Sequence, residues 1–215
     1  MISRSEATDA PVPLDRRAAR RQETKAEIVA AGWDLVRENG LAGLAMRDLG
    51  ERVGMKAQSI YSYFGSKHEI YDAMFHEGYL AFAAAADELL QNPTAEPLDQ
   101  VRAMAHQFFQ FCTSDPVRYQ LLFQRTIPEF VPSDESFALA VEIHESIADW
   151  LAELGVTDAG AVDLWTAVLT GLTDQQISND PGGDRWERLV DRAIDMTLRE
   201  IAPHLFEKTK GNVTS

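Results

Sequence analysis

The chain has 215 residues, enough for one well-packed core or two small ones. Hydrophobic residues make up 45% of it, as in ordinary globular proteins, and no apolar run approaches the length of a membrane span. Its single cysteine, Cys112, excludes an intrachain disulfide framework and a thiolate-rich zinc site. The first 21 residues lack the apolar centre of a signal peptide, so we expect a cytoplasmic protein that does not engage a membrane.

The net charge of −14 is distributed unevenly along the sequence. Residues 1–70 contain 11 Lys and Arg against 10 Asp and Glu, whereas the remaining residues contain 9 against 24. Four arginines, Arg16, Arg17, Arg20 and Arg21, lie together near the start. A nucleic-acid partner requires a local basic surface rather than a basic total. From charge alone, however, a solvated basic tail is the preferred interpretation of these arginines.

The first helical pattern covers residues 22–39. Ile28, Gly32 and Leu35 share one stripe, as a core-facing helix requires, and Asn39-Gly40 ends it. The spacing of Thr24 and Glu27 fits a capping box, although the arginine cluster offers an alternative, earlier start. We therefore expect a flexible basic arm over residues 1–21 and a first domain over residues 22–70.

Two short helices follow, at Met46–Val53 and Ala57–Phe64. Aromatic and serine residues alternate in the second segment, which also fits a strand. The glycines on either side, Gly54 and Gly65, instead fit two helices separated by a tight turn. Ile60 and Phe64 then share one face and can join the core of the first helix. Two short helices joined by a glycine-containing turn and braced by longer ones indicate a helix-turn-helix.

A second capping box, Ser66 to Glu69, predicts a long fourth helix over residues 66–90. The remaining chain, residues 71–207, is expected to form a larger helical domain, and residues 208–215 a flexible tail. Its helices are predicted at Leu98–Thr113, Pro116–Gln124, Phe137–Leu154, Asp158–Asn179 and Asp184–Leu205. The fold class predicted from these patterns is all-α.

Several short motifs of the first domain occur in a characteristic order. Arg47-Asp48-Leu49-Gly50 precedes Val53-Gly54, and Ile60-Tyr61-Ser62-Tyr63-Phe64 precedes Ser66-Lys67. Over about fifty residues, from Gln22 to roughly Met74, this order resembles the TetR family of bacterial transcriptional regulators. One departure is Ala45, which stands where the family commonly has a capping Thr or Ser.

The resemblance implies an N-terminal three-helix DNA-binding domain, joined by the fourth helix to a larger ligand-binding and dimerisation domain. By similarity, the last two long helices pair across a homodimer. The last helix also carries an apolar stripe, including Val190, Ala193 and Ile194, which is too broad for a single neighbour and so predicts a second partner across the dimer. The stretch Leu164–Leu172 is similar to a C-terminal subtype signature of the family, but Thr170 replaces its His.

A recognition helix needs an apolar back and a polar front that fits the major groove. Gln58 offers paired donor and acceptor groups to adenine, and Lys56 is placed to reach guanine or phosphate. The resemblance places Tyr61 and Lys67 on phosphates. The alternative is that the tyrosines merely pack and the lysine is solvated. The complete set of candidate DNA-binding residues is Thr24, Arg47, Lys56, Ala57, Gln58, Ser59, Tyr61, Ser62, Tyr63 and Lys67.

Aromatic residues of the second domain are candidates for a ligand cavity between helices. Aromatic residues at helical spacing are also what a plain core contains. The acidic excess of this domain fits either a cationic ligand or a solvated surface. The principal ligand-binding candidates are Met104, Phe108, Phe111, Phe123, His144 and Trp165, with His106, Phe130, Phe137 and Trp150 as further ones.

Enzyme activity finds little support in the sequence. The five histidines lack the spacing of metal sites on helices, and no phosphate-binding loop or nucleophile elbow occurs. We therefore expect no catalytic residue, metal or cofactor. The predicted function is a ligand-responsive repressor that binds a palindromic operator in double-stranded DNA as a homodimer and is released by a small, largely apolar effector. A DNA-binding adaptor without an effector and a transcriptional activator remain alternatives.

Overall fold

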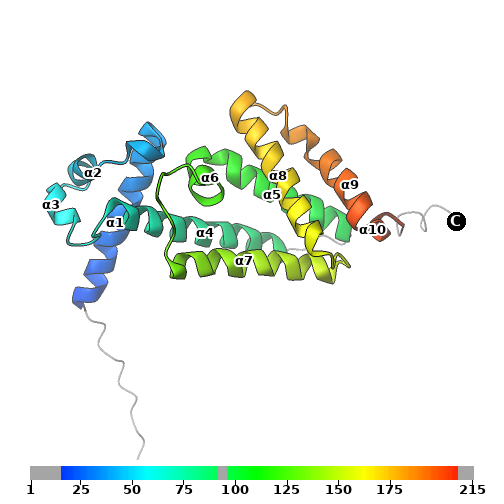
Figure 1. The fold of residues 1–215 in the computed structure, drawn as a ribbon, viewed down its shortest axis with the longest axis horizontal. Helices are drawn as coiled ribbons and strands as arrows, with labels where there is room; N and C mark the ends of the chain where they lie inside the picture. Colours follow the sequence, from blue (N-terminus) through cyan, green and yellow to red (C-terminus); the bar gives the residue numbers. More distant parts are fainter. Residues whose placement is uncertain (1–15, 92–95, 208–215) are drawn as a thin grey trace, which may run out of the picture.

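The computed structural model describes residues 16–91 and 96–207. Within them the regular secondary structure is helical, which confirms the predicted all-α class (Figure 1). The N-terminal helices gather at one end of the molecule and the C-terminal helices at the other, with α4 running between them (Figure 1). The elements are α1 (Arg16–Asn39), η1 (Leu41–Gly43), α2 (Met46–Arg52), α3 (Ala57–Ile60), α4 (Lys67–Gln91), α5 (Pro97–Ser114), α6 (Pro116–Phe123), α7 (Asp134–Glu153), α8 (Ala159–Asn179), η2 (Glu187–Leu189), α9 (Val190–Ile201) and α10 (His204–Glu207).

Helix α1 buries Ile28, Gly32 and Leu35, as the apolar stripe predicts. It begins earlier than residue 22, so residues 16–21 are helical and do not form part of an arm. Thr24 is not the helix cap, because its hydroxyl donates to the Arg20 carbonyl at 3.0 Å inside the helix. Helix-favouring Ala and Arg residues before it extend the helix upstream. The rest of the expected arm, residues 1–15, and the expected tail, residues 208–215, lie outside the described residues.

Helices α2 and α3 meet at a sharp turn. Gly54 adopts φ +69°, a conformation that favours glycine. The α2 N-cap, Ala45, makes no side-chain hydrogen bond. Helix α3 ends at Ile60, so the predicted extension to Phe64 is wrong. The Ser62 hydroxyl donates to the Ser59 carbonyl at 2.7 Å, and this competes with the helical ladder beyond Ile60.

Helix α4 begins as the capping box predicts. The Glu69 N–H donates to the Ser66 hydroxyl oxygen at 3.2 Å, and the Gly65 N–H donates to the Glu69 carboxylate at 2.7 Å. The helix packs against α1 through Ile70 and Met74, and further along it enters the second domain with Phe82. One rigid element therefore belongs to both ends of the molecule (Figure 1).

The predicted last helix, Asp184–Leu205, is divided into η2, α9 and α10. Pro203 interrupts it because proline has no N–H for a helical bond. The stripe of α9 is buried through Val190, Ile194 and Leu198 against α5 and α8 of the same chain. The breadth of this stripe therefore does not by itself require a second chain.

Three apolar clusters hold the fold together. One joins α1–α4 at the N-terminal end, one lies among α5, α7, α8 and α9, and one is an aromatic cluster between α4, α5 and α6. Cys112 is fully buried in the aromatic cluster, and burial raises the pKa of its thiol. Across residues 16–91 and 96–207, no helix has the length and apolar character needed to cross a membrane.

Candidate DNA-binding surface and ligand cavity

Helix α3 has the two faces that a recognition helix requires. Ile60 is completely buried beneath it, whereas Gln58 and Ser59 point to solvent and Lys56 is exposed at its N-cap. The Tyr61 side chain, in the following turn, is 48% exposed. The described geometry thus presents a short row of polar and aromatic groups on the outside of the helix-turn-helix.

Two basic residues of α1 brace this row, and neither was among the candidate DNA-binding residues. The Arg21 guanidinium donates to the Ser62 carbonyl at 2.6 Å and lies 4.9 Å from the centre of the Tyr63 ring. The Lys25 ammonium lies 5.1 Å from the centre of the Phe64 ring. Their spacing of four residues places both on one face of α1. That signal is readable in the sequence once the helix is extended upstream.

The Lys67 side chain is half-buried and contacts other parts of the fold. Its ammonium donates to the Ala42 carbonyl at 3.3 Å and lies 5.3 Å from the centre of the Tyr71 ring. Burial lowers the pKa of Lys67. The Tyr71 hydroxyl in turn donates to the Leu41 carbonyl. Lys67 therefore helps to hold η1 against the start of α4, at the positive end of the helix dipole.

The two remaining DNA-binding candidates are occupied within their own helices. The Thr24 hydroxyl bonds to a carbonyl of α1, and Arg47 forms ion pairs with Asp48 at 3.5 Å and with Glu51 at 3.4 Å. The Arg47 side chain is 81% exposed, so these ion pairs are weak and can exchange for a phosphate.

An apolar cavity of about 150 Å³ lies between α4, α5, α6, α7 and α8. Four of the six principal ligand candidates line it: Phe108, Phe123, His144 and Trp165. Its remaining lining residues are Tyr79, Phe82, Ala140, Ile143, Ile147, Thr166 and Leu169. We call it the inner cavity.

The other two principal candidates, Met104 and Phe111, are buried but line neither this cavity nor the next. The Phe111 ring instead supports the Arg118 guanidinium at 3.9 Å. For these two residues the plain-core interpretation fits the structure. His106, a further candidate, bonds to Asp191 at 2.9 Å and also lies outside both cavities.

A second cavity, of about 210 Å³, opens beside the first, and we call it the outer cavity. Tyr79 and Phe123 belong to the linings of both. Burial raises the pKa of Tyr79 to about 12, so its hydroxyl stays protonated and donates to the Leu122 carbonyl at 3.3 Å. The other lining residues are Phe75, Leu121, Leu122, Gln124, Arg125, Ile127, Phe130, Val131, Pro132 and Phe137.

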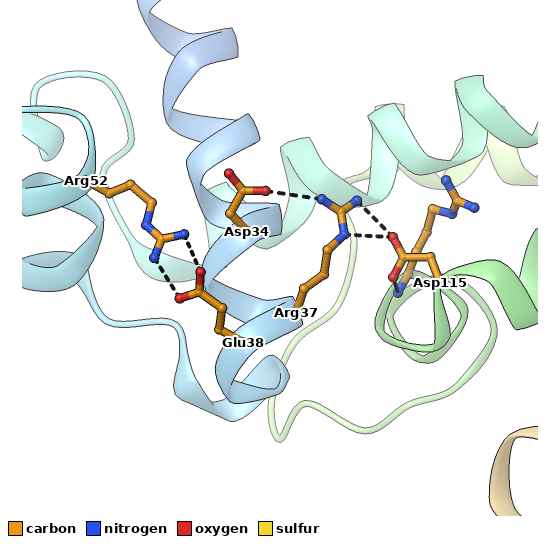
Figure 2. Close-up of polar contacts among 6 residues, drawn as sticks. Asp34, Arg37, Glu38, Arg52 and Asp115 are labelled. Atoms are coloured by element: carbon orange, nitrogen blue, oxygen red, sulfur yellow. Dashed lines mark hydrogen bonds and ion pairs between the residues drawn. The ribbon is translucent and has the colours of Figure 1, made fainter. Parts of the chain in front are cut away.

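Helix α6 lies between these cavities and the DNA-binding end. At its N-terminus the Asp115 carboxylate accepts two bonds from Arg37 of α1, at 2.8 and 3.0 Å (Figure 2). The same carboxylate caps α6 by accepting from the Arg118 N–H at 3.1 Å. Arg37 also lies 3.4 Å from Asp34 on its own helix. The Asp115 side chain is only 12% exposed, so this contact is partly shielded from solvent.

A separate ion pair holds the helix-turn-helix to α1. Arg52 of α2 donates to both carboxylate oxygens of Glu38, at 2.9 and 2.6 Å (Figure 2). These hydrogen bonds lower the pKa of Glu38. The C-terminal part of α1 thus contacts α2 on one side and α6 on the other (Figure 2).

The C-terminal end of α6 is anchored to α8. The Tyr119 hydroxyl and the Gln124 amide both donate to the same Asp174 carboxylate oxygen, each at 2.8 Å. Burial, with a smaller contribution from Asp174, raises the pKa of Tyr119. Because Leu121, Leu122 and Phe123 of α6 line the outer cavity, any change there acts on a helix that is fixed at both ends.

These features are a helix-turn-helix with an exposed polar face, joined by α4 to a second group of helices that contains two cavities. Residues 28–74 match the family model described as bacterial regulatory proteins, tetR family. This match confirms, for the helix-turn-helix end of the chain, the resemblance to the TetR family of transcriptional regulators that the sequence shows.

Curated relatives include transcriptional regulators of different modes. The regulator Rv1816 of Mycobacterium tuberculosis is 25% identical over 65% of this chain and 60% of its own length. The activator FasR of Mycolicibacterium smegmatis is 24% identical over 70% of this chain and 68% of its own length. The repressor NemR of Escherichia coli is 30% identical over 42% of this chain and 46% of its own length. The chain thus spans about 60% of the length of Rv1816.

Solved structures share the whole architecture. FadR from Bacillus subtilis, in complex with stearoyl-CoA, has a TM-score of 0.62 and 18% identity over 80% of this chain and 96% of that one. PfmR from Thermus thermophilus has a TM-score of 0.61 and 22% identity over 80% and 94%. At these identities the likeness concerns the fold.

Proposed function

We propose that this DNA-binding regulator is a repressor that binds a palindromic operator as a homodimer and is released by a small, largely apolar effector. The observation that carries the proposal is that the chain has both an exposed polar recognition helix and two cavities. Helix α6 lines these cavities and is bonded to α1 of the helix-turn-helix end through Asp115 and Arg37. A fully packed second domain would have favoured an adaptor without an effector. The two cavities argue against that alternative.

The proposed DNA contacts follow from exposure. Gln58 reads a base edge, because its amide is the exposed group of α3 that pairs bidentately with adenine. Lys56, Tyr61 and Arg21 contact phosphates from around it, and Lys67 contributes from the start of α4. Ala57, Ser59, Ser62 and Tyr63 shape the surface between them, with Thr24 and Arg47 at its edge.

The proposed dimer uses faces of α8 and α9 that the single chain leaves uncovered. Leu164 is 42% exposed and Met196 is 65% exposed, on helices whose other faces are buried. At Gly171 an added Cβ would meet no atom within 4 Å, so a partner helix has room to approach there. A two-fold dimer would present two recognition helices to half-sites about 34–36 Å apart.

The proposed switch changes that spacing. An effector in the cavities displaces α6 and tilts α4, and the recognition helices then no longer match successive grooves. The effector must bind the DNA-incompetent state more tightly, and a tenfold preference corresponds to about 1.4 kcal/mol. By reciprocity, operator DNA weakens effector binding by the same factor. The complex of FadR with stearoyl-CoA, on the same fold, supports an effector with an apolar part.

Selection of bound fragments from random duplex DNA tests the proposal. We expect a palindromic consensus, with log affinity falling against log salt at a slope of about −0.9 per neutralised phosphate. A non-palindromic site would contradict dimeric binding, and salt-insensitive binding would contradict the phosphate contacts. Transcription from the recovered operator then separates repression from activation, the mode named for FasR.

A further inference from the structure

The charge of the cavity linings differs from that of the domain that contains them. Residues 71–215 carry 24 Asp and Glu against 9 Lys and Arg. Among the described residues that line the inner and outer cavities there is no Asp, Glu or Lys, and the only permanently charged side chain is Arg125. The acidic groups therefore lie elsewhere, and the acidity of the domain gives no support for a cationic ligand.

Arg125 also differs from other arginines of its domain. Arg102 pairs with Asp195 at 2.8 Å, Arg118 donates to the Phe111 carbonyl at 3.0 Å, and Arg199 lies 4.2 Å from the centre of the Phe206 ring. Arg125 makes no hydrogen bond or ion pair with any residue that the structure describes. It is exposed at the outer cavity, next to the buried apolar wall formed by Leu121 and Leu122.

A guanidinium beside apolar side chains in a cavity favours one class of ligand. It can form a bidentate bond with a carboxylate, and the bond is strengthened where apolar walls exclude water. A ligand ammonium at the same place would meet a like charge. Tyr79 and Phe123 line both cavities, so the two cavities adjoin, and an apolar chain bound at Arg125 would lie next to the inner cavity.

We propose that the effector is an amphipathic acid, with its carboxylate paired to Arg125 at the outer cavity and its apolar chain reaching the inner cavity. This inference rests on the proposed function, since it names the chemical class of the effector of that same site. Arg125 is then the residue that selects the charge of the ligand, and the inner cavity selects the length of its chain.

Direct calorimetric titration of the full chain, without DNA, tests the charge preference. The probes are decanoate, decanol and decylamine below their micellar concentrations, which differ only in the head group. We expect decanoate to bind about tenfold more tightly than decanol, equivalent to about 1.4 kcal/mol, and decylamine to bind most weakly. Equal binding of all three, tightest binding of the amine, or no binding of any would overturn the proposal.

Substitutions at one position assign the preference to Arg125. Arg125→Gln should reduce decanoate affinity to that of decanol and leave decanol unchanged, whereas Arg125→Lys should restore much of the difference. Arg188→Gln is the matched control, because the Arg188 side chain is exposed, donates to the Arg185 carbonyl at 3.4 Å, and lies outside both cavities. If Arg125→Gln binds decanoate as the unmodified chain does, the carboxylate lies elsewhere and the proposal is wrong.

Filling the inner cavity with a larger side chain tests whether the apolar chain of the ligand binds there. Ala140 lines the inner cavity only, so Ala140→Phe should weaken decanoate several-fold more than hexanoate. Equal loss for both acids would contradict an extended pose, and retained helical circular dichroism separates this result from misfolding. Operator release is measured separately with the same acids. Binding without release would contradict the proposed regulation while leaving the ligand class intact.

Discussion

The two ends of this molecule place their proposed sites in opposite ways. At the N-terminal end, Gln58 and its neighbours lie exposed on the outside of a small core. In the second domain, Phe108, Phe123 and Trp165 face inward around cavities that no single residue defines. A site on the surface depends on the identity of a few exposed side chains. A cavity instead depends on how much space several packed helices leave unfilled between them.

The proposed dimer is the property of the second domain on which operator binding would depend most, and its loss has the largest expected effect. Gly171→Glu should convert the protein to monomers and weaken operator binding by roughly 10²–10⁴-fold, because the second half-site is no longer held by avidity. The position is suited to the test because an added Cβ meets no neighbour in the single chain. Sedimentation and operator titration provide the two measurements.

Gly171→Ala is the matched control for that substitution. It adds only a methyl group to a helix and should stabilise the fold by about 0.5–1 kcal/mol while retaining the dimer. Ala193, in the apolar stripe of α9, is a less suitable position because it is half-buried in the single chain, so a charge there would also disturb the fold. A dimeric Gly171→Glu variant would place the interface elsewhere.

The turn of the helix-turn-helix is the corresponding weak point of the first domain. At Gly50 an added Cβ would lie 2.7 Å from the Met55 carbonyl oxygen and 3.1 Å from the Ala57 nitrogen, both backbone atoms. Gly50→Ala should therefore cost about 1–3 kcal/mol and displace α3 from α2. We expect operator affinity to fall by at least about tenfold while decanoate affinity, measured calorimetrically, is unchanged. Loss of both would mean that the two ends do not fold independently of this turn.

Base reading is tested by a smaller change. Gln58→Ala should relax preference at one base pair of each half-site, at a cost of about 1–3 kcal/mol, because a bidentate pair with adenine is lost. Ser59→Ala, at the adjacent exposed position, should leave the preference nearly intact. Binding to an operator library with each position varied gives the comparison. A uniform loss with unchanged preference would assign Gln58 to the backbone instead.

The first domain could be predicted closely from sequence because its signals are local. The turn glycines and the capping box at Ser66 are set by residues within a few positions of one another. The errors were local as well. Helix-favouring residues before Thr24 extend α1 upstream, and a hydrogen bond of the Ser62 hydroxyl competes with the end of α3, and the capping-box spacing resolves neither.

The cavities were predicted less completely because they depend on non-local packing. Four of the six principal candidates line the inner cavity. Phe111, one helical turn from Phe108 on α5, instead belongs to the packed core. Arg125 lies in a loop without periodicity, so no pattern marked it. Helical spacing shows which residues face inward, but whether the space beside them is filled depends on helices far apart in the sequence.

Breaking the ion pair between Arg37 of α1 and Asp115 of α6, which links the two ends, is expected to have the smallest effect. Arg37→Gln removes the charge that binds Asp115, the cap of α6, but leaves the cavities and α3 untouched (Figure 2). Because Arg37 is 46% exposed, solvent screens the pair, and we expect the coupling between effector and operator to fall by on the order of 0.5–1 kcal/mol. Asp115→Asn retains a capping side chain and should give the same loss, without an additive effect in the double variant.

Arg52→Gln is the matched control, since it breaks a neighbouring ion pair within the DNA-binding end and does not contact α6. The measurement is operator affinity with and without saturating decanoate for each variant. If Arg37→Gln and Arg52→Gln reduce the coupling equally, the signal does not pass through Asp115, and α4 alone connects the cavities to the recognition helix.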